Sequence, residues 1–369
     1  MILSFISVIV TFGMVIFLHE GGHFLVCRKL GVRVERFAFG FGPELLGFTS
    51  GGTRFSICAI PLGGFVKPAG ESIEDHTGHP DEYFSRAPWE RLLIVAAGPA
   101  MNYVLAFAMF FLVVFFKGIP EGSTQPVIGD LAPNYPAAEA GMLPGDRILK
   151  VDSVDVAKWS DLAEYVYVRP GTPVKVTYAR SGEVKLVEVT PRLDAASKRG
   201  LIGIVQGVEY RKIGFVGSVV EALKECWHWT AYTVTSLAEK IWAREKPDLA
   251  GPVGIVQMVS RAAHSGLENL VQLIGLISVA IGFFNILPIP LLDGGHALLY
   301  IYEWVSRKKL TTAIVGAANS VGLALLMSLL LFATYNDIMR IRDGRKAAKD
   351  AKKAAEAVVT PTPAPAPAK

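Results

Sequence analysis

The sequence predicts a polytopic α-helical membrane protein of about four spans, with an inserted β-rich domain and a membrane-associated β-hairpin. The 369 residues are 51% hydrophobic, and the mean hydropathy of +0.38 is too high for an ordinary soluble protein. Four segments reach the length of about 20 mostly apolar residues that a bilayer span requires. A long polar stretch separates the second of these segments from the third.

The four predicted spans cover roughly residues 1–26, 92–116, 267–288 and 311–333. The first begins with eighteen uncharged residues, "MILSFISVIVTFGMVIFL". Since it lacks a basic n-region and an A-x-A-like cleavage site, we expect a retained helix rather than a secretory signal.

Composition excludes several classes of function. The net charge of +4 is weak and no basic stripe carries interleaved aromatic residues, which argues against nucleic acid as a partner. Cys27, Cys58 and Cys226 are scattered and form no CxxC pair. We therefore expect neither a disulfide framework nor a cysteine metal cluster.

The segments between the spans have distinct patterns. Short alternating runs divided by Pro and Gly predict a small β-rich domain over about 120–210. Alternation over 53–70 predicts a β-hairpin whose turn is Pro61 with Gly63-Gly64. Residues 216–243 are amphipathic but too polar to span, which indicates an interfacial helix.

The positions of basic residues predict the orientation in the membrane. Basic side chains follow the first span, precede the second and separate the third from the fourth: Arg28, Lys29, Arg33, Arg36, Arg86, Arg91, Arg307, Lys308 and Lys309. By the positive-inside rule these connections are cytoplasmic and the β-rich domain is outside. The C-terminal cluster Arg340, Arg342, Arg345 and Lys346 opposes this orientation, because four spans put that end outside.

The end of the first span carries the sequence His19-Glu20-x-x-His23. Histidines four residues apart share one helix face and can bind one metal, and Glu20 is placed to accept a proton from the attacking water. Three ionisable groups in an apolar span are costly, at about 2.5–3.5 kcal/mol for a charged side chain, so a chance motif is disfavoured. Gly21 and Gly22 would allow another backbone to approach closely.

Zinc requires a third protein ligand and an open position. Residues 283–296, "FFNILPIPLLDGGH", contain Pro288 and Pro290, which break the third span and place Asp293 just after the break. The first and third spans run in the same direction, so their C-terminal ends share a membrane face. Asp293 is therefore the expected third ligand, the alternative being a helix N-cap.

Together these motifs resemble the site-2 protease family of intramembrane zinc proteases, in its bacterial RseP type. The resemblance covers most of the chain through "GVRVERFAFGFGPELLGF", "PLGGFVKPAGE", "AAGPAMNYVLA", "GPVGI" and "YNDIMR". It implies that Zn2+ is bound by His19, His23 and Asp293, that Glu20 is the catalytic base and that Asn285 holds or polarises the substrate. It also implies an external C-terminus.

A transmembrane substrate must unwind before a zinc protease can reach its carbonyl groups. The exposed edge of the hairpin in 53–70 could hold the unwound segment by β-addition, and the family is similar in having a membrane-associated β loop. The expected substrate contacts are Ile57, Ala59, Gly63, Gly64 and Phe65. The alternative is a plain surface hairpin.

The segment 135–156 resembles bacterial PDZ domains, with 200–204 as the closing strand. The available length suits one PDZ domain, which would bind an extended peptide at a strand edge. The predicted organisation is a first membrane half, a PDZ domain, an interfacial helix with a GPxG linker, a second membrane half and a disordered tail, over 1–118, 119–208, 209–264, 265–340 and 341–369.

The expected function is zinc-dependent endopeptidase activity on a single-span membrane protein, within or near its span, after another protease has trimmed the external part. The expected location is the bacterial inner membrane, with the active site near the cytoplasmic face. The family suggests an anti-sigma factor in envelope stress as substrate. Two alternatives are a non-enzymatic PDZ scaffold and a metal transporter, whose intramembrane ionisable residues would line a pathway.

Overall fold

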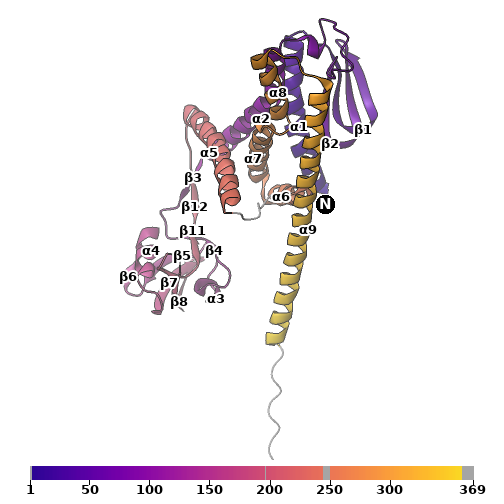
Figure 1. The fold of residues 1–369 in the computed structure, drawn as a ribbon. Helices are drawn as coiled ribbons and strands as arrows, with labels where there is room; N and C mark the ends of the chain where they lie inside the picture. Colours follow the sequence, from indigo (N-terminus) through magenta and orange to yellow (C-terminus); the bar gives the residue numbers. More distant parts are fainter. Residues whose placement is uncertain (1, 196, 244–249, 360–369) are drawn as a thin grey trace, which may run out of the picture. The chain divides into compact units, whose positions relative to one another are not determined.

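The computed structural model describes residues 2–195, 197–243 and 250–359. The chain divides into two compact units, one formed by 1–113 with 219–369 and the other by Val114–Ser218. Long helices dominate the first unit and short strands the second (Figure 1).

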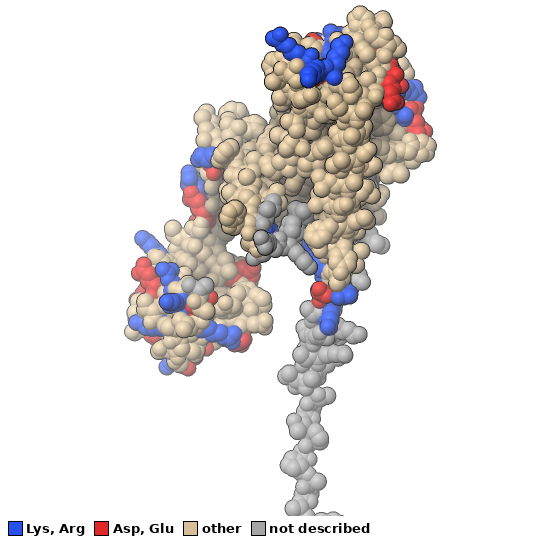
Figure 2. Space-filling view, viewed as in Figure 1, with Lys and Arg blue, Asp and Glu red and all other residues tan. Residues whose placement is uncertain are grey.

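The first unit is built from long apolar helices. They are α1 (Ile2–Lys29), α2 (Pro88–Lys117), α5 (Phe215–Trp242), α6 (Pro252–Ser265), α7 (Leu267–Ile286), α8 (Asp293–Ser306) and α9 (Thr312–Val359), with a short 3-10 turn η1 (Tyr83–Ser85). Within the described ranges, four segments are long and apolar enough to cross a membrane: Ile2–Lys29, Pro88–Lys117, Leu267–Ile286 and Thr312–Gly344. On the face shown in Figure 2, charged side chains gather toward the ends of the long helices and leave the middle uncharged.

Small residues bring α1, α2 and α7 close together. A Cβ atom at Gly22 would lie 2.3 Å from the carbonyl oxygen of Ala97, and one at Gly275 would lie 2.7 Å from the ring of Phe110. Close backbone approach of this kind is how helices pack in a bilayer, where the hydrophobic effect between helices is weak. Of the predicted pair of small residues, Gly22 is used in this way, whereas Gly21 has nothing within 4 Å.

The third span ends where its sequence predicts. α7 stops at Ile286, Leu287 is extended, and the turn through Pro288 and Pro290 leads directly into α8. A Cβ atom at Gly294 would lie 2.2 Å from the carbonyl oxygen of Ile286. The first turn of α8 can therefore pack against the end of α7 only with glycine at this position.

The hairpin is longer than predicted and turns elsewhere. β1 (Val34–Ser50) and β2 (Thr53–Pro68) pair antiparallel with several register shifts, and Gly51-Gly52, both with positive φ, forms the turn. The prediction of a hairpin within 53–70 that turns at Pro61 and Gly63-Gly64 is wrong, since 53–68 is one irregular strand.

The register shifts fold the two strands into a wider sheet. Phe37 is paired with both Phe55 and Val66, and Phe55 is also paired with Phe48. The order across the sheet is therefore 64–68, 34–39, 54–57 and 46–50. The outer segments 64–68 and 46–50 form its two edges.

The second unit is β-rich. Its main sheet has the order β6-β5-β7-β8, and three short pairs join β3 to β12, β4 to β11 and β9 to β10. The strands are β3 (Ile119–Gly122), β4 (Ile128–Leu131), β5 (Arg147–Val151), β6 (Val154–Asp155), β7 (Val174–Arg180), β8 (Glu183–Val189), β9 (Arg192–Leu193), β10 (Gly200–Leu201), β11 (Ile204–Gln206) and β12 (Val208–Arg211), with helices α3 (Pro136–Glu139) and α4 (Trp159–Tyr167). Its core contains Ile128, Met142, Ile148, Leu162, Val174 and Val176.

Two further predictions concern the second half of the chain. The expected closing strand at 200–204 is divided between β10 and the start of β11. The tail expected to be disordered over 341–369 is helical as far as Val359, because its Ala- and Lys-rich sequence consists of strong helix formers. Residues 360–369 lie outside the described part.

The predicted fold class is confirmed: the chain combines four membrane-length helices, a long β-hairpin and an inserted β-rich unit. The predicted domain bounds stay a prediction. α5 coincides closely with the helix predicted over 216–243 and is not among the four candidate spans of the described residues, while its place at the membrane interface stays a prediction.

Candidate metal centre

The centre lies where the C-terminal part of α1 meets the start of α8. The rings of His19 and His23 are one helical turn apart and T-shaped, with centroids 4.9 Å apart. Asp293 is the first residue of α8, whose N-cap residue is Leu292. Its carboxylate points at the two imidazoles rather than capping its own helix.

The three side chains converge, and each imidazole faces one of the two carboxylate oxygens of Asp293. Nε2 of His19 lies 3.2 Å from Oδ2 of Asp293, Nε2 of His23 lies 3.5 Å from Oδ1, and the two Nε2 atoms are 3.3 Å apart. Tetrahedral zinc with bonds of about 2.0–2.1 Å separates its ligand atoms by about 3.3 Å. Two imidazole nitrogens and one carboxylate oxygen are also a donor set of catalytic zinc, so the residues fit this ion.

Glu20 lies beside these three side chains, on the same turn of α1 as His19 and His23. Its Oε2 atom accepts a hydrogen bond of 3.1 Å from the backbone N–H of Val66. Val66 belongs to the edge segment 64–68 of the sheet. The carboxylate is thus held at the place where the metal centre and the strand edge meet.

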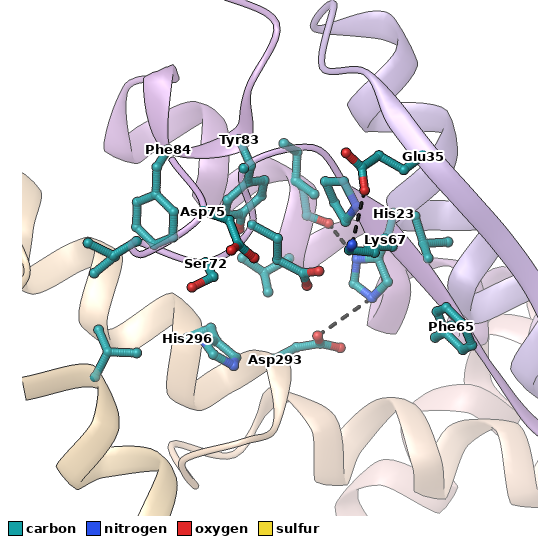
Figure 3. A pocket seen from close by; sticks show the side chains of 18 of the residues that line it. His23, Glu35, Phe65, Lys67, Ser72, Asp75, Tyr83, Phe84, Asp293 and His296 are labelled. Carbon is teal, nitrogen blue, oxygen red and sulfur yellow. Dashed lines mark hydrogen bonds and ion pairs between the residues drawn. The ribbon is translucent and has the colours of Figure 1, made fainter. Parts of the chain in front are cut away.

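A cavity of about 1550 Å³ opens onto the three side chains and Glu20. Figure 3 shows His23 and Asp293 facing one another in it, with His296, Lys67 and Phe65 around them. Its wall is rich in polar and charged groups, which is the environment that a hydrolytic reaction in an apolar protein requires. The cavity gives water access to side chains that belong to a membrane-length helix.

The predicted substrate contacts fall into two groups: residues that line the cavity and residues that do not. Gly63, Gly64, Phe65 and Asn285 line it. Ile57 and Ala59 do not belong to its wall, and Ile57 is paired on both sides, with Phe39 and with Leu46. Because an inner strand has no free backbone groups, Ile57 cannot offer an edge for β-addition.

His296 also lines the cavity. Its ring is stacked on Tyr300, with centroids 6.3 Å apart. Among the described residues, the group of side chains that could hold a metal ion consists of His19, His23 and Asp293; His296 lies outside this group, in the wall of the cavity.

Three residues of the site were not predicted individually, although Asn102 and Glu71 lie in segments that resemble the family. Nδ1 of His23 is 2.8 Å from the carbonyl oxygen of Ile94, and Nδ1 of His19 is 3.2 Å from the side-chain amide of Asn102. Glu71 lines the cavity as well; although solvent reaches it, burial of its carboxyl group raises its pKa to about 7, and the Glu20 carboxylate adds to this shift.

One predicted surface charge is not at the surface. Arg91, assigned to a cytoplasmic connection, is buried and forms an ion pair of 3.0 Å with Glu303 of α8. Its guanidinium lies 4.8 Å from the ring centroids of both Phe84 and Tyr300. A basic residue near a span end can therefore pair inside the protein, and Arg91 does not count toward the positive-inside bias.

Comparison with known proteins connects this geometry with a family. The model of peptidase family M50 matches residues 7–329. A relative from Agrobacterium fabrum that carries a zinc metalloprotease name is 36% identical over 356 residues, covering 89% of this chain and 94% of its own. The zinc metalloprotease RasP of Geobacillus kaustophilus is 30% identical over 417 residues, covering 91% and 98%.

Among solved structures, the PDZ domain of an SdrC-like protein from Listeria monocytogenes matches with 19% identity and a TM-score of 0.21, covering 23% of this chain and 90% of its own. The family match extends across both membrane halves and includes all of the metal-centre side chains. The chain therefore belongs to peptidase family M50, the site-2 proteases, and is a membrane zinc metalloendopeptidase.

Proposed function

We propose that the chain is an intramembrane endopeptidase in which His19, His23 and Asp293 hold zinc and Glu20 is the general base. The observation that carries the proposal is the convergence of the two imidazoles on each other and on the Asp293 carboxylate, at contact distances of 3.2–3.5 Å, at the end of a membrane-length helix. The cavity gives water access to it. A non-enzymatic scaffold is excluded by the family, and a transporter would need polar groups along several spans rather than at one end.

Each side chain has a role in this reaction. When bound, zinc supplies Lewis-acid activation of water and of the scissile carbonyl group. Glu20 accepts the proton of the attacking water and returns it to the leaving amine. Asn285, in the wall of the same cavity, orients the substrate backbone through its side-chain amide.

The substrate is a single-span membrane protein whose helix unwinds beside the edge segment 64–68. An extended peptide added to this edge would lie along Gly64 and Phe65, between the sheet and the metal centre, and it would end beside Val66, whose N–H is donated to Glu20. The hydrogen bond between Val66 and Glu20 supports this placement, because it puts the edge within hydrogen-bond reach of the proposed base. Gly63, with a positive φ of 108°, ends the edge at the cavity.

The remaining features follow the orientation indicated by the basic connections. The metal centre is near the cytoplasmic face of a bacterial inner membrane and the β-rich unit is external. The described residues that line the cavity all belong to the helical unit. The β-rich unit acts as a PDZ domain that binds an extended peptide or excludes substrates with bulky external parts, so that trimmed proteins such as an anti-sigma factor are cleaved.

The test is cleavage of co-expressed single-span substrates, with zinc content measured on the same preparations. Glu20→Gln should retain about one zinc per chain and lose cleavage by several orders of magnitude. Asp293→Asn should lose both, because it removes the charged ligand. The control Glu164→Gln changes an exposed residue of α4 and should retain both. Full activity in Glu20→Gln, or stoichiometric zinc with full activity in Asp293→Asn, would refute the assignment.

A further inference from the structure

One face of α2 contacts both histidines of the metal centre. Ile94, Gly98 and Asn102 are four residues apart in sequence and so lie on one helix face. The carbonyl oxygen of Ile94 meets His23 and the side chain of Asn102 meets His19. Between them, a Cβ atom at Gly98 would lie 2.3 Å from Nε2 of His23 and 2.8 Å from Cε1 of His19.

The contact with Ile94 determines the tautomer of His23. A backbone carbonyl oxygen can only accept a hydrogen bond, so Nδ1 of His23, 2.8 Å away, carries the proton. Nε2, which faces Asp293, is then left with its lone pair free. This is the tautomer that a metal ligand requires.

The same requirement applied to His19 reverses the orientation of the Asn102 amide. Nε2 of His19 faces the other ligands, so in the metal-binding tautomer Nδ1 carries the proton and needs an acceptor. The atom placed 3.2 Å from it is the amide nitrogen of Asn102, which can only donate. Meanwhile the Oδ1 atom of Asn102 is buried without a hydrogen-bond partner in the described structure. Amide oxygen and nitrogen differ little in shape, and their assignment follows from the hydrogen bonds.

We propose that Asn102 is a positioning residue for zinc: its side-chain oxygen accepts a hydrogen bond from Nδ1–H of His19, and with the Ile94 carbonyl it fixes both imidazoles with Nε2 open to the metal. This inference rests on the proposed ligand set. The segment AAGPAMN in α2 thus has a role at the metal centre. The helix α2 supplies a hydrogen-bond acceptor for each histidine, and Gly98 leaves space for both imidazole rings.

The surroundings hold Asn102 in place. Its side chain is fully buried, and its backbone oxygen accepts a hydrogen bond of 2.8 Å from the hydroxyl of Ser278 in α7. Its Cβ atom lies 3.2 Å from the position that a Cβ would take at Gly282. The Asn102 side chain packs against α7 on one side and faces His19 on the other, so it has little freedom to change its conformation. A residue that orients a metal ligand needs such a fixed position.

A zinc-affinity series distinguishes this role from plain packing. Asn102→Leu keeps the size of the side chain but removes the acceptor, whereas Asn102→Asp keeps an oxygen at the same position. Zinc dissociation constants are measured on the purified full chain by chelator competition, and the absorption of the Co2+-substituted protein reports on ligand geometry. We expect Asn102→Leu to weaken zinc binding by about 10- to 100-fold, the usual effect of losing such a partner, and Asn102→Asp to restore it.

The matched control is Thr11→Val, which also removes a fully buried polar group without a partner in the described structure, but outside the cavity wall. It should leave zinc affinity unchanged. Wild-type affinity in Asn102→Leu, or an Asn102→Asp variant as weak as Asn102→Leu, would overturn the inference. If Asp293→Asn bound zinc as tightly as wild type, the proposed ligand set itself would fail, and the two failures are thus separable.

Discussion

Replacing Arg91 by Met tests how the helix that begins with Asp293 is held. The Arg91 side chain is 3% exposed and its partner Glu303, in α8, is 13% exposed. Phe84 and Tyr300 cover the guanidinium, and its Nε atom donates to the carbonyl oxygen of Arg86 at 3.2 Å. The substitution leaves the Glu303 carboxylate in an apolar interface without its counter-charge.

The expected cost follows from this burial. Removing one partner of a buried ion pair destabilises a protein by about 3–5 kcal/mol, because the remaining charge stays desolvated. Exposed pairs cost about 0–1 kcal/mol. The pair between Arg33 and Asp81, whose side chains are 48% and 32% exposed, serves as the comparison within the same unit. Arg91→Met should therefore cost several times as much as Arg33→Met.

The assay is reversible unfolding in detergent, applied to Arg91→Met, Glu303→Leu and the double variant. The double variant removes both charges, so it should be much more stable than the sum of the single effects predicts. A cost below about 1 kcal/mol for Arg91→Met, similar to that of an exposed pair, would refute the reasoning. Additive single effects would show that the two charges do not act as a pair.

Three further predictions follow from the cavity and the second unit. Gly98→Ala should abolish zinc binding, because the new Cβ atom would lie 2.3 Å from Nε2 of His23. The control Gly21→Ala places its Cβ where nothing lies within 4 Å and should not change zinc content. Equal zinc content in the two variants would contradict the close contact at Gly98. The raised pKa of Glu71, about 7, means that the folded chain holds a proton which the unfolded chain releases, so this group lowers stability as pH rises from 4.5 to 7. Metal-free Glu71→Gln should therefore melt at a higher temperature than wild type at pH 8, with the gain shrinking toward pH 4.5, and a gain independent of pH would exclude this cause. Replacing 126–205 by a short Gly/Ser linker retains the β3–β12 pair and should allow cleavage of untrimmed substrates at unchanged zinc content; continued rejection of the precursor would place selection in the membrane unit.

The four spans and the metal motif were predictable because they depend on local properties. Membrane length is a property of one continuous apolar segment, and the spacing of His19 and His23 follows from the helical repeat. The break at Pro288 and Pro290 is equally local, since proline lacks the N–H that a helix needs. Asp293 was predictable one step further, through the shared direction of two spans.

The position of the sheet edge and the burial of Arg91 depend instead on contacts between residues far apart in the sequence. The sheet edge beside Glu20 is 64–68 rather than Ile57, because register shifts between β1 and β2 place the middle of β2 between two neighbouring strand segments, and no alternation pattern encodes such shifts. Arg91 has the sequence of a loop cation, yet Glu303, which neutralises it, comes from another helix more than 200 residues later.

The sequence alone therefore determined which residues can carry the chemistry, because helix periodicity, span length and proline breaks act within a few turns. The tertiary structure determined what supports them. Ile94 and Asn102 face the histidines only because glycines let α1, α2 and α7 approach to contact distance. Contacts between segments far apart in the chain depend on how whole helices pack, and that information lies in the combined surfaces of the helices rather than in any one of them.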